Sequence, residues 1–165
     1  MRKNITWAIL MAATALIQTT WLDAVQVKGV TPNLVLLVVI YFAITDGEER
    51  AMFSGVLGGL FQDVARDSVL GHHVLCYVAV GFLTGRIAIR LITQHPAVKV
   101  GLVCIAGLFF GLFYSIILAV QDPQWAVFAS LKRTVIPSTL YTALLTPFVF
   151  FAMDRLFQRH YSPQP

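Results

Sequence analysis

The sequence predicts an all-α integral membrane protein with about six transmembrane helices. Hydrophobic residues make up 58% of the 165 residues and charged residues only 12%, and the mean hydropathy is +0.76. A soluble fold of this length would lack the polar side chains needed to cover its surface. The apolar stretches are also close to the roughly 20 residues that span a hydrocarbon core. Because the connections between them are short, we predict one polytopic membrane domain over residues 1–165.

The predicted spans cover residues 5–21, 32–45, 51–64, 70–92, 97–120 and 134–153. The first follows Arg2 and Lys3 like a signal peptide, but no A-x-A cleavage pattern closes it, so we interpret it as a retained helix. Thr31 is the predicted N-cap of the second span, with Pro32 at its first helical position.

The later boundaries rest on helix signals of the same kind. The third span has two carboxylates, Glu48 and Glu49, in its first turn, where the positive end of the helix dipole favours them. The break at His95-Pro96 separates the fourth and fifth spans, and the sixth begins at Thr134 or Pro137. The third span is the one whose full crossing must be decided by the distribution of basic residues.

The connection at 122–133 predicts a short interfacial helix. Asp122 and Pro123 would cap it, and Trp125 and Phe128 would share its apolar face. The alternative is an irregular loop anchored by Trp125 in the outer interface.

The distribution of basic residues predicts the topology, because cytoplasmic loops carry the excess of Lys and Arg. With six crossings, eight lie on the N-terminal side (Arg2, Lys3, Arg50, Arg86, Arg90, Lys99, Arg155, Arg159) and four lie opposite (Lys28, Arg66, Lys132, Arg133). Without the third crossing the count is six against six. We therefore expect a bacterial inner-membrane protein with both termini in the cytoplasm.

Small residues recur at four-residue spacing in three of the predicted helices. Such stripes let helices approach closely in a bilayer, where the hydrophobic effect does not drive their association. The candidate packing or partner-interface residues are Gly55, Gly59, Asp63, Gly81, Gly85, Gly107 and Gly111. We expect internal packing first, with a partner interface as the alternative.

Asp63 differs from the other residues of its stripe because a carboxylate near membrane depth must find a partner. One hypothesis is a proton or metal site with Asp67, His72 and His73. The alternative is an ordinary outer turn in which Asp63 pairs with Arg66 or caps the fourth helix. Adjacent histidines do not have the spacing of metal ligands, so we expect the structural role and no metal.

Arg86 and Arg90 are four residues apart near the cytoplasmic end of the fourth helix, and with Trp125 they are candidate anchors for lipid or a partner. The basic residues form no contiguous basic and aromatic surface, so we expect no nucleic-acid partner. Catalytic signatures such as G-x-S-x-G, a Walker loop or H-E-x-x-H do not occur in the sequence. We therefore expect neither an enzyme nor a cofactor.

The order of several motifs resembles the rod shape-determining protein MreD family. These motifs are Thr31-Pro32-Asn33-Leu34, the acidic turn Asp46 to Arg50, and Gly55, Gly59-Leu60, Asp63 and Gly71 in the same register. The resemblance implies a non-enzymatic membrane subunit of the rod elongation complex, involved in cell-shape maintenance and lateral peptidoglycan synthesis. It implies four partners besides membrane lipids: an MreC-like bitopic protein, a RodA-like glycosyltransferase, its transpeptidase and an MreB-like filament.

The resemblance also implies a fold similar to the S-components of energy-coupling-factor transporters. The alternative function is therefore that of a small-molecule-binding transporter subunit. Such a subunit should enclose a pocket near its outer face, lined by polar or aromatic side chains. Tyr77, Trp21, Trp125 and Asp63 are the residues that could contribute to one.

Overall fold

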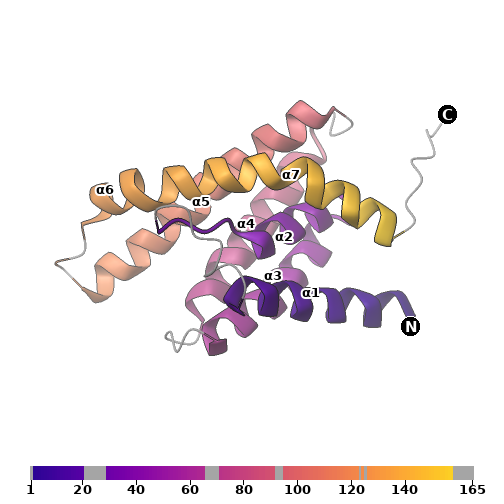
Figure 1. Ribbon diagram of the computed structural model, residues 1–165, viewed down its shortest axis with the longest axis horizontal. Coiled ribbons are helices and arrows are strands. Elements are labelled where there is room, and N and C mark those ends of the chain that lie inside the picture. The colour runs from indigo at the N-terminus through magenta and orange to yellow at the C-terminus, as the bar shows by residue number, and fades with distance from the viewer. Residues whose placement is uncertain are drawn as a thin grey trace.

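The computed structural model describes residues 2–20, 29–65, 71–91, 95–122, 124 and 126–157, with side chains from Thr6 onward. Over these residues the chain is helical throughout, which confirms the predicted all-α class (Figure 1). The helices are α1 (Arg2–Thr20), α2 (Leu34–Thr45), α3 (Glu48–Ala65), α4 (His72–Ala88), α5 (Pro96–Gln121), α6 (Val127–Ser130), the π-helix η1 (Leu131–Val135) and α7 (Ile136–Leu156). The N-terminal end of α1 and the C-terminal end of α7 lie at the same end of the molecule (Figure 1).

The N-terminus of α2 is capped differently from the prediction. Asn33, not Thr31, is the N-cap, and its side-chain oxygen accepts a hydrogen bond from the backbone N–H of Leu36 at 2.9 Å. Pro32 therefore lies before the helix and not at its first position. Asparagine is the stronger N-cap residue because its carbonyl reaches the second and third helical N–H groups.

Over the described residues, the short helix predicted at 122–133 is continuous with the sixth span. Residues from Val127 continue through η1 into α7 as one helical segment, Val127–Leu156. Pro137 has no N–H to donate to the carbonyl of Arg133, and the backbone widens just before it, so that the N–H of Ile136 donates to the carbonyl of Leu131, five residues back. The sixth helix thus begins earlier than Thr134 because a π turn accommodates the proline.

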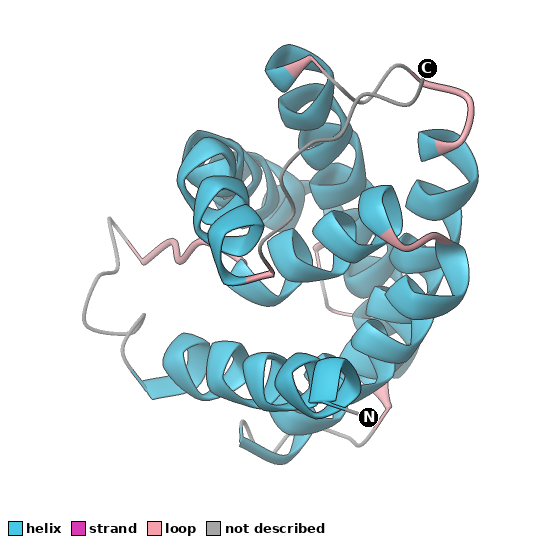
Figure 2. Cartoon of the chain, turned by 90° about the vertical axis from the view of Figure 1, so that its right-hand side faces the viewer, coloured by secondary structure: helices cyan, strands magenta, loops and turns pink. Residues whose placement is uncertain are grey.

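Helix α2 is the centre of the molecule. Its residues from Val35 to Ala43 are all buried, and it contacts α1, α3, α4, α5 and α7. Two polar contacts fix it to α7: the backbone N–H of Asn33 donates to Thr142 Oγ1 at 2.9 Å, and the Tyr41 hydroxyl donates to Asp154 at 2.8 Å. Figure 2 shows the other helices arranged around this centre.

The outer surface is apolar, and part of the interior is polar. On α7 the exposed side chains include Leu140, Leu144 and Phe148, whereas Thr142 and Thr146 are buried. Exposed apolar surface of this extent is unfavourable in water. By length and composition, Pro96–Gln121 and Val127–Leu156 are able to cross a membrane. The pattern indicates that the surrounding medium of these two helices is lipid.

Candidate functional site

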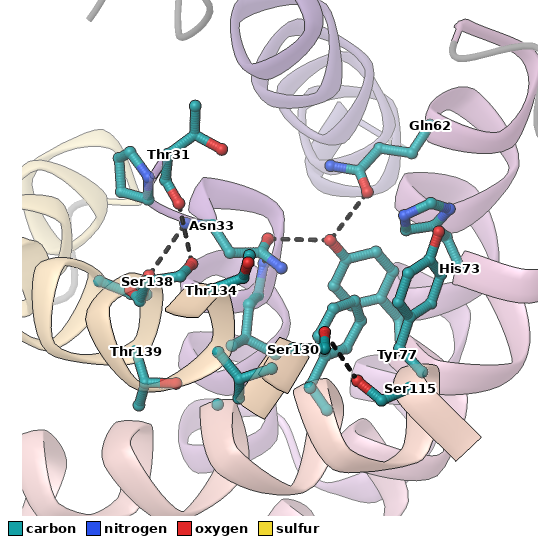
Figure 3. Close-up of a pocket in the computed structure, with 18 of the residues that line it drawn as sticks. Thr31, Asn33, Gln62, His73, Tyr77, Ser115, Ser130, Thr134, Ser138 and Thr139 are labelled. Atoms are coloured by element: carbon teal, nitrogen blue, oxygen red, sulfur yellow. Dashed lines mark hydrogen bonds between the residues drawn. The ribbon is translucent and has the colours of Figure 1, made fainter. Parts of the chain in front are cut away.

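A cavity of about 310 Å³ lies where six helical ends converge. Its walls come from the C-terminal ends of α1, α3 and α5 and from the N-terminal ends of α2, α4 and the Val127–Leu156 segment. Representative lining side chains are Gln18, Asn33, Gln62, Tyr77, Tyr114 and Thr134. Figure 3 shows polar groups from several of these helices directed toward the same space. In a small helical protein a concave site of this kind is the first candidate for binding.

Two amides fix the N-terminus of α2 at the wall of the cavity. The side-chain oxygen of Asn33 accepts hydrogen bonds from Gln18 Nε2 at 3.2 Å and from the Tyr77 hydroxyl at 2.8 Å, besides the capping contact. Gln18 Oε1 accepts from the backbone N–H of Val35 at 2.8 Å. Because the first N–H groups of a helix have no partner within it, these contacts satisfy groups that burial would otherwise penalise.

Gln62 differs from Gln18 in its hydrogen bonding. Its side chain is 1% exposed, and its Oε1 accepts from the Tyr77 hydroxyl at 2.9 Å (Figure 3). Its Nε2 is buried and has no hydrogen-bond partner among the described residues. A buried amide group left without a partner is costly and requires an explanation.

One wall of the cavity is aromatic. The rings of Tyr77 and Phe110 stack with centroids 4.6 Å apart, and Phe110 lies parallel to Tyr114 at 6.2 Å. The His73 ring is 4.9 Å from Tyr114. These rings make one side of the cavity aromatic, next to the Tyr77 hydroxyl that contacts Gln62.

Hydroxyl groups also line the cavity. Ser138 donates to the carbonyl of Thr31 at 2.8 Å, and Ser115 and Ser130 are 3.4 Å apart (Figure 3). The π-helix η1 contributes Thr134 and Val135 to the lining. The described lining includes no Asp, Glu, Lys or Arg side chain, so the cavity is polar without carrying a formal charge of that kind.

Asp63 caps the start of α4 from the end of α3. Its two oxygens accept hydrogen bonds from the backbone N–H of Gly71 at 2.8 Å and of His73 at 3.1 Å, and one of them also lies 2.8 Å from His73 Nδ1. This is the capping alternative predicted for it. Arg66 and Asp67 lie outside the described residues, and among the described residues no three or more His, Cys, Asp and Glu side chains gather as metal ligands.

The small-residue stripes of α3 and α4 face each other. A Cβ atom on Gly59 would lie 2.5 Å from the backbone of Val74, and one on Gly55 would lie 2.8 Å from Tyr77. In return, a Cβ on Gly81 would lie 3.0 Å from Ala51, and one on Gly85 2.6 Å from Glu48. The four glycines therefore bring the two helix backbones into contact within the chain.

Gly107 and Gly111 of α5 face the other long helical segment. A Cβ atom on Gly107 would lie 2.8 Å from the Thr139 side chain, and one on Gly111 would collide with Val135. Both glycines also line the cavity. Thus the α5 stripe has an internal contact and leaves space for the site.

The proposed anchors are separate from the cavity. At the end of α4 that lies away from the cavity, Arg86 Nε is 3.0 Å from a carboxylate oxygen of Glu48, the first residue of α3. Arg90 lies in the turn beyond α4 and not on it, because the helix ends at Ala88 with the N–H of Arg90 donating to the carbonyl of Ile87. Trp125 and Trp21 lie outside the described residues.

Sequence reasoning missed the amides of the cavity. It identified Tyr77 as a possible pocket residue, but not Gln18, Asn33 or Gln62. Their signal is nonetheless present, because each is an uncharged polar side chain in or beside an apolar run, where such a group needs a partner. Asp63 reaches the cavity only through its contact with His73.

The fold and the site define an all-helical membrane protein with a polar cavity at one end. The family described as rod shape-determining protein MreD matches residues 1–158. The chain therefore belongs to the MreD family, as the motif order predicted. Searches of curated proteins and of solved structures gave no match.

Proposed function

We propose that the chain is a non-enzymatic inner-membrane subunit of the rod elongation complex, involved in cell-shape maintenance and lateral peptidoglycan synthesis. The observation that carries the proposal is the match to the MreD family over residues 1–158. The apolar exterior of α5 and α7 supports a multi-pass position in the bilayer. We expect both termini in the cytoplasm, on the basis of the eight-to-four distribution of basic residues.

The proposed partners are an MreC-like bitopic protein, a RodA-like glycosyltransferase with its transpeptidase, and an MreB-like filament. Helix packing within the chain uses the glycines of α3, α4 and α5, so these stripes are not free for partners. The exposed apolar faces of α5 and α7 remain available for contact with lipid or with partner helices.

Depletion of the protein from its own rod-shaped cells tests this function. We expect rounded cells, and we expect the full-length protein to recover MreC-like and RodA-like chains when purified from membranes in mild detergent. Unchanged cell shape after depletion, together with purification free of those chains, would contradict the proposal.

A second candidate function is that of a small-molecule-binding subunit resembling a transporter S-component. The polar cavity of about 310 Å³ favours it, because pockets for small molecules begin near this size. Recovery of a vitamin-like molecule or an ATPase module with the purified protein would support this function over the first.

A further inference from the structure

The amide of Gln62 cannot be satisfied by its neighbours in either orientation. The Tyr77 hydroxyl has one proton for two acceptors, Gln62 Oε1 at 2.9 Å and Asn33 Oδ1 at 2.8 Å. If the Gln62 amide is flipped, its NH₂ group donates to the Tyr77 hydroxyl oxygen. Its carbonyl oxygen then occupies the position of the nitrogen and lacks a donor. One end of the amide therefore remains unpartnered at the cavity.

The surroundings of Gln62 define the chemistry of an occupant. The aromatic wall of Tyr77, Phe110 and Tyr114 offers an apolar surface, and the amide beside it offers both a donor and an acceptor. The described lining has no Asp, Glu, Lys or Arg to pair with a charged ligand, and its His73 is already paired with Asp63 at 2.8 Å. Transfer of an unpaired ion into such a site would be strongly unfavourable.

We propose that the cavity binds an uncharged group that carries both a hydrogen-bond donor and an acceptor, such as a carboxamide, with Gln62 as its primary contact. A free small molecule or an inserted side chain of a partner protein supplies this group. The inference rests on the same cavity as the second proposed function, but it does not depend on the rod-complex function.

Nicotinamide and nicotinate are suitable probes because they match in size and differ in charge. We expect the full-length protein in detergent to bind nicotinamide with millimolar affinity, as is typical for a ligand of about nine non-hydrogen atoms. Binding of nicotinate should be at least tenfold weaker. Saturation-transfer NMR and titration calorimetry measure both.

The variant Gln62→Met tests whether the Gln62 amide serves to bind a ligand and not to stabilise the fold. It preserves the approximate volume of the side chain and removes its hydrogen bonding, so nicotinamide affinity should fall at least tenfold. Since the amide is not fully satisfied in the free protein, the Tm should stay equal or rise. The matched control is Gln18→Met. The Gln18 amide is hydrogen-bonded at both ends, so its removal should lower the Tm.

The proposal would be overturned by equal binding of nicotinate, by nicotinamide binding that survives Gln62→Met, or by no binding at all, which would mean a cavity filled by water only. A Tm loss in Gln62→Met as large as that in Gln18→Met would also overturn it, because the amide would then be structural. These readouts need no partner protein, so they can fail or succeed separately from the cell-shape test.

Purification from native membranes distinguishes the two sources of the group. If wild-type protein carries a small bound mass in native mass spectrometry and Gln62→Met does not, the ligand is a free molecule. If instead Gln62→Met loses a co-purifying partner chain, that partner supplies the group. If the variant matches the wild type in both measurements, the proposal fails.

Discussion

Single atoms decide the packing between α3 and α4. At Gly59 the position of a Cβ atom is 2.5 Å from two backbone atoms of Val74, a separation at which neither side can yield by a rotamer change. Gly101 on α5 offers the opposite case, because a Cβ there meets nothing within 4 Å. Comparing alanine substitutions at the two glycines therefore distinguishes the cost of a steric clash from the general preference of helices for alanine over glycine.

Gly59→Ala should lower the free energy of unfolding by about 3 kcal/mol, near the upper end for overpacking, because two backbones must separate. Gly101→Ala should leave stability unchanged or raise it by up to about 1 kcal/mol. Thermal unfolding in detergent, with membrane abundance by immunoblot, measures both. Equal stability of the two variants would show that the α3 and α4 backbones are farther apart than the structure has them.

Asp63 is the second residue whose replacement has a definite expected cost. Asp63→Ala leaves the N–H groups of Gly71 and His73 without their acceptor. Since each buried group left unsatisfied costs roughly 1–3 kcal/mol, the free energy of unfolding should fall by about 3 kcal/mol. Asp63→Asn keeps one acceptor and should lose about half as much. The control is Asp122→Ala, which removes only an exposed contact to Gln124 and should change stability by less than about 0.5 kcal/mol.

At the scale of the element, α7 reverses the arrangement of a soluble amphipathic helix. Its threonines Thr139, Thr142 and Thr146 are buried, and its outward side carries Leu140, Leu144 and Phe148. Inside the protein Thr142 donates to the backbone carbonyl of Ser138 at 2.7 Å, and Thr146 donates to that of Thr142 at 3.2 Å. Lipid accepts the leucines and the phenylalanine at no cost.

Spin labels on α7 should therefore report lipid on one side only. In a background with Cys76 and Cys104 replaced by alanine, a label at Leu144→Cys should be accessible to oxygen and shielded from a water-soluble nickel complex. A label at Thr142→Cys should be shielded from both, because Thr142 is 1% exposed. High accessibility to nickel at position 144 would place this face of α7 in water.

At the scale of the whole molecule, the cavity lies at one end because three helices end there and the next helix along the chain begins there each time. The ends of α1, α3 and α5 meet the starts of α2, α4 and the Val127–Leu156 segment at this end. Polar side chains from six helical ends thus gather at one level. The proposed topology, with the N-terminus in the cytoplasm, would make this level the outer one.

Reporter fusions test the orientation. Fusions after Asp46, Arg66, Thr93, Asp122 and Tyr161 should read inside, outside, inside, outside and inside, because the Lys and Arg excess is held on the cytoplasmic side. An outside signal at Tyr161 would contradict six crossings. Because the cavity lies at the opposite end of the molecule from the C-terminal end of α7, it would also place the cavity level on the cytoplasmic side.

The sequence by itself determined the helical class, the family, the positions of most helices and the capping role open to Asp63. These features are local or compositional: apolar length, helix-start residues and motif order act within one segment. The α2 boundary was predicted wrongly, and the sixth helix begins earlier than predicted, because a competing cap at Asn33 and a π turn before Pro137 depend on a few neighbouring backbone contacts.

Only the tertiary structure decided the partners of the glycines and the existence of the cavity. Gly59 meets Val74, and Gln62 meets Tyr77, which in turn meets Asn33. The residue pattern of one helix does not predict which residues of another helix it will contact. In an apolar chain, every side of a helix can face either the protein interior or lipid. The choice is made by the fit of small residues and by buried amides that must find partners, and one of those amides, Gln62, keeps an end without a partner at the cavity.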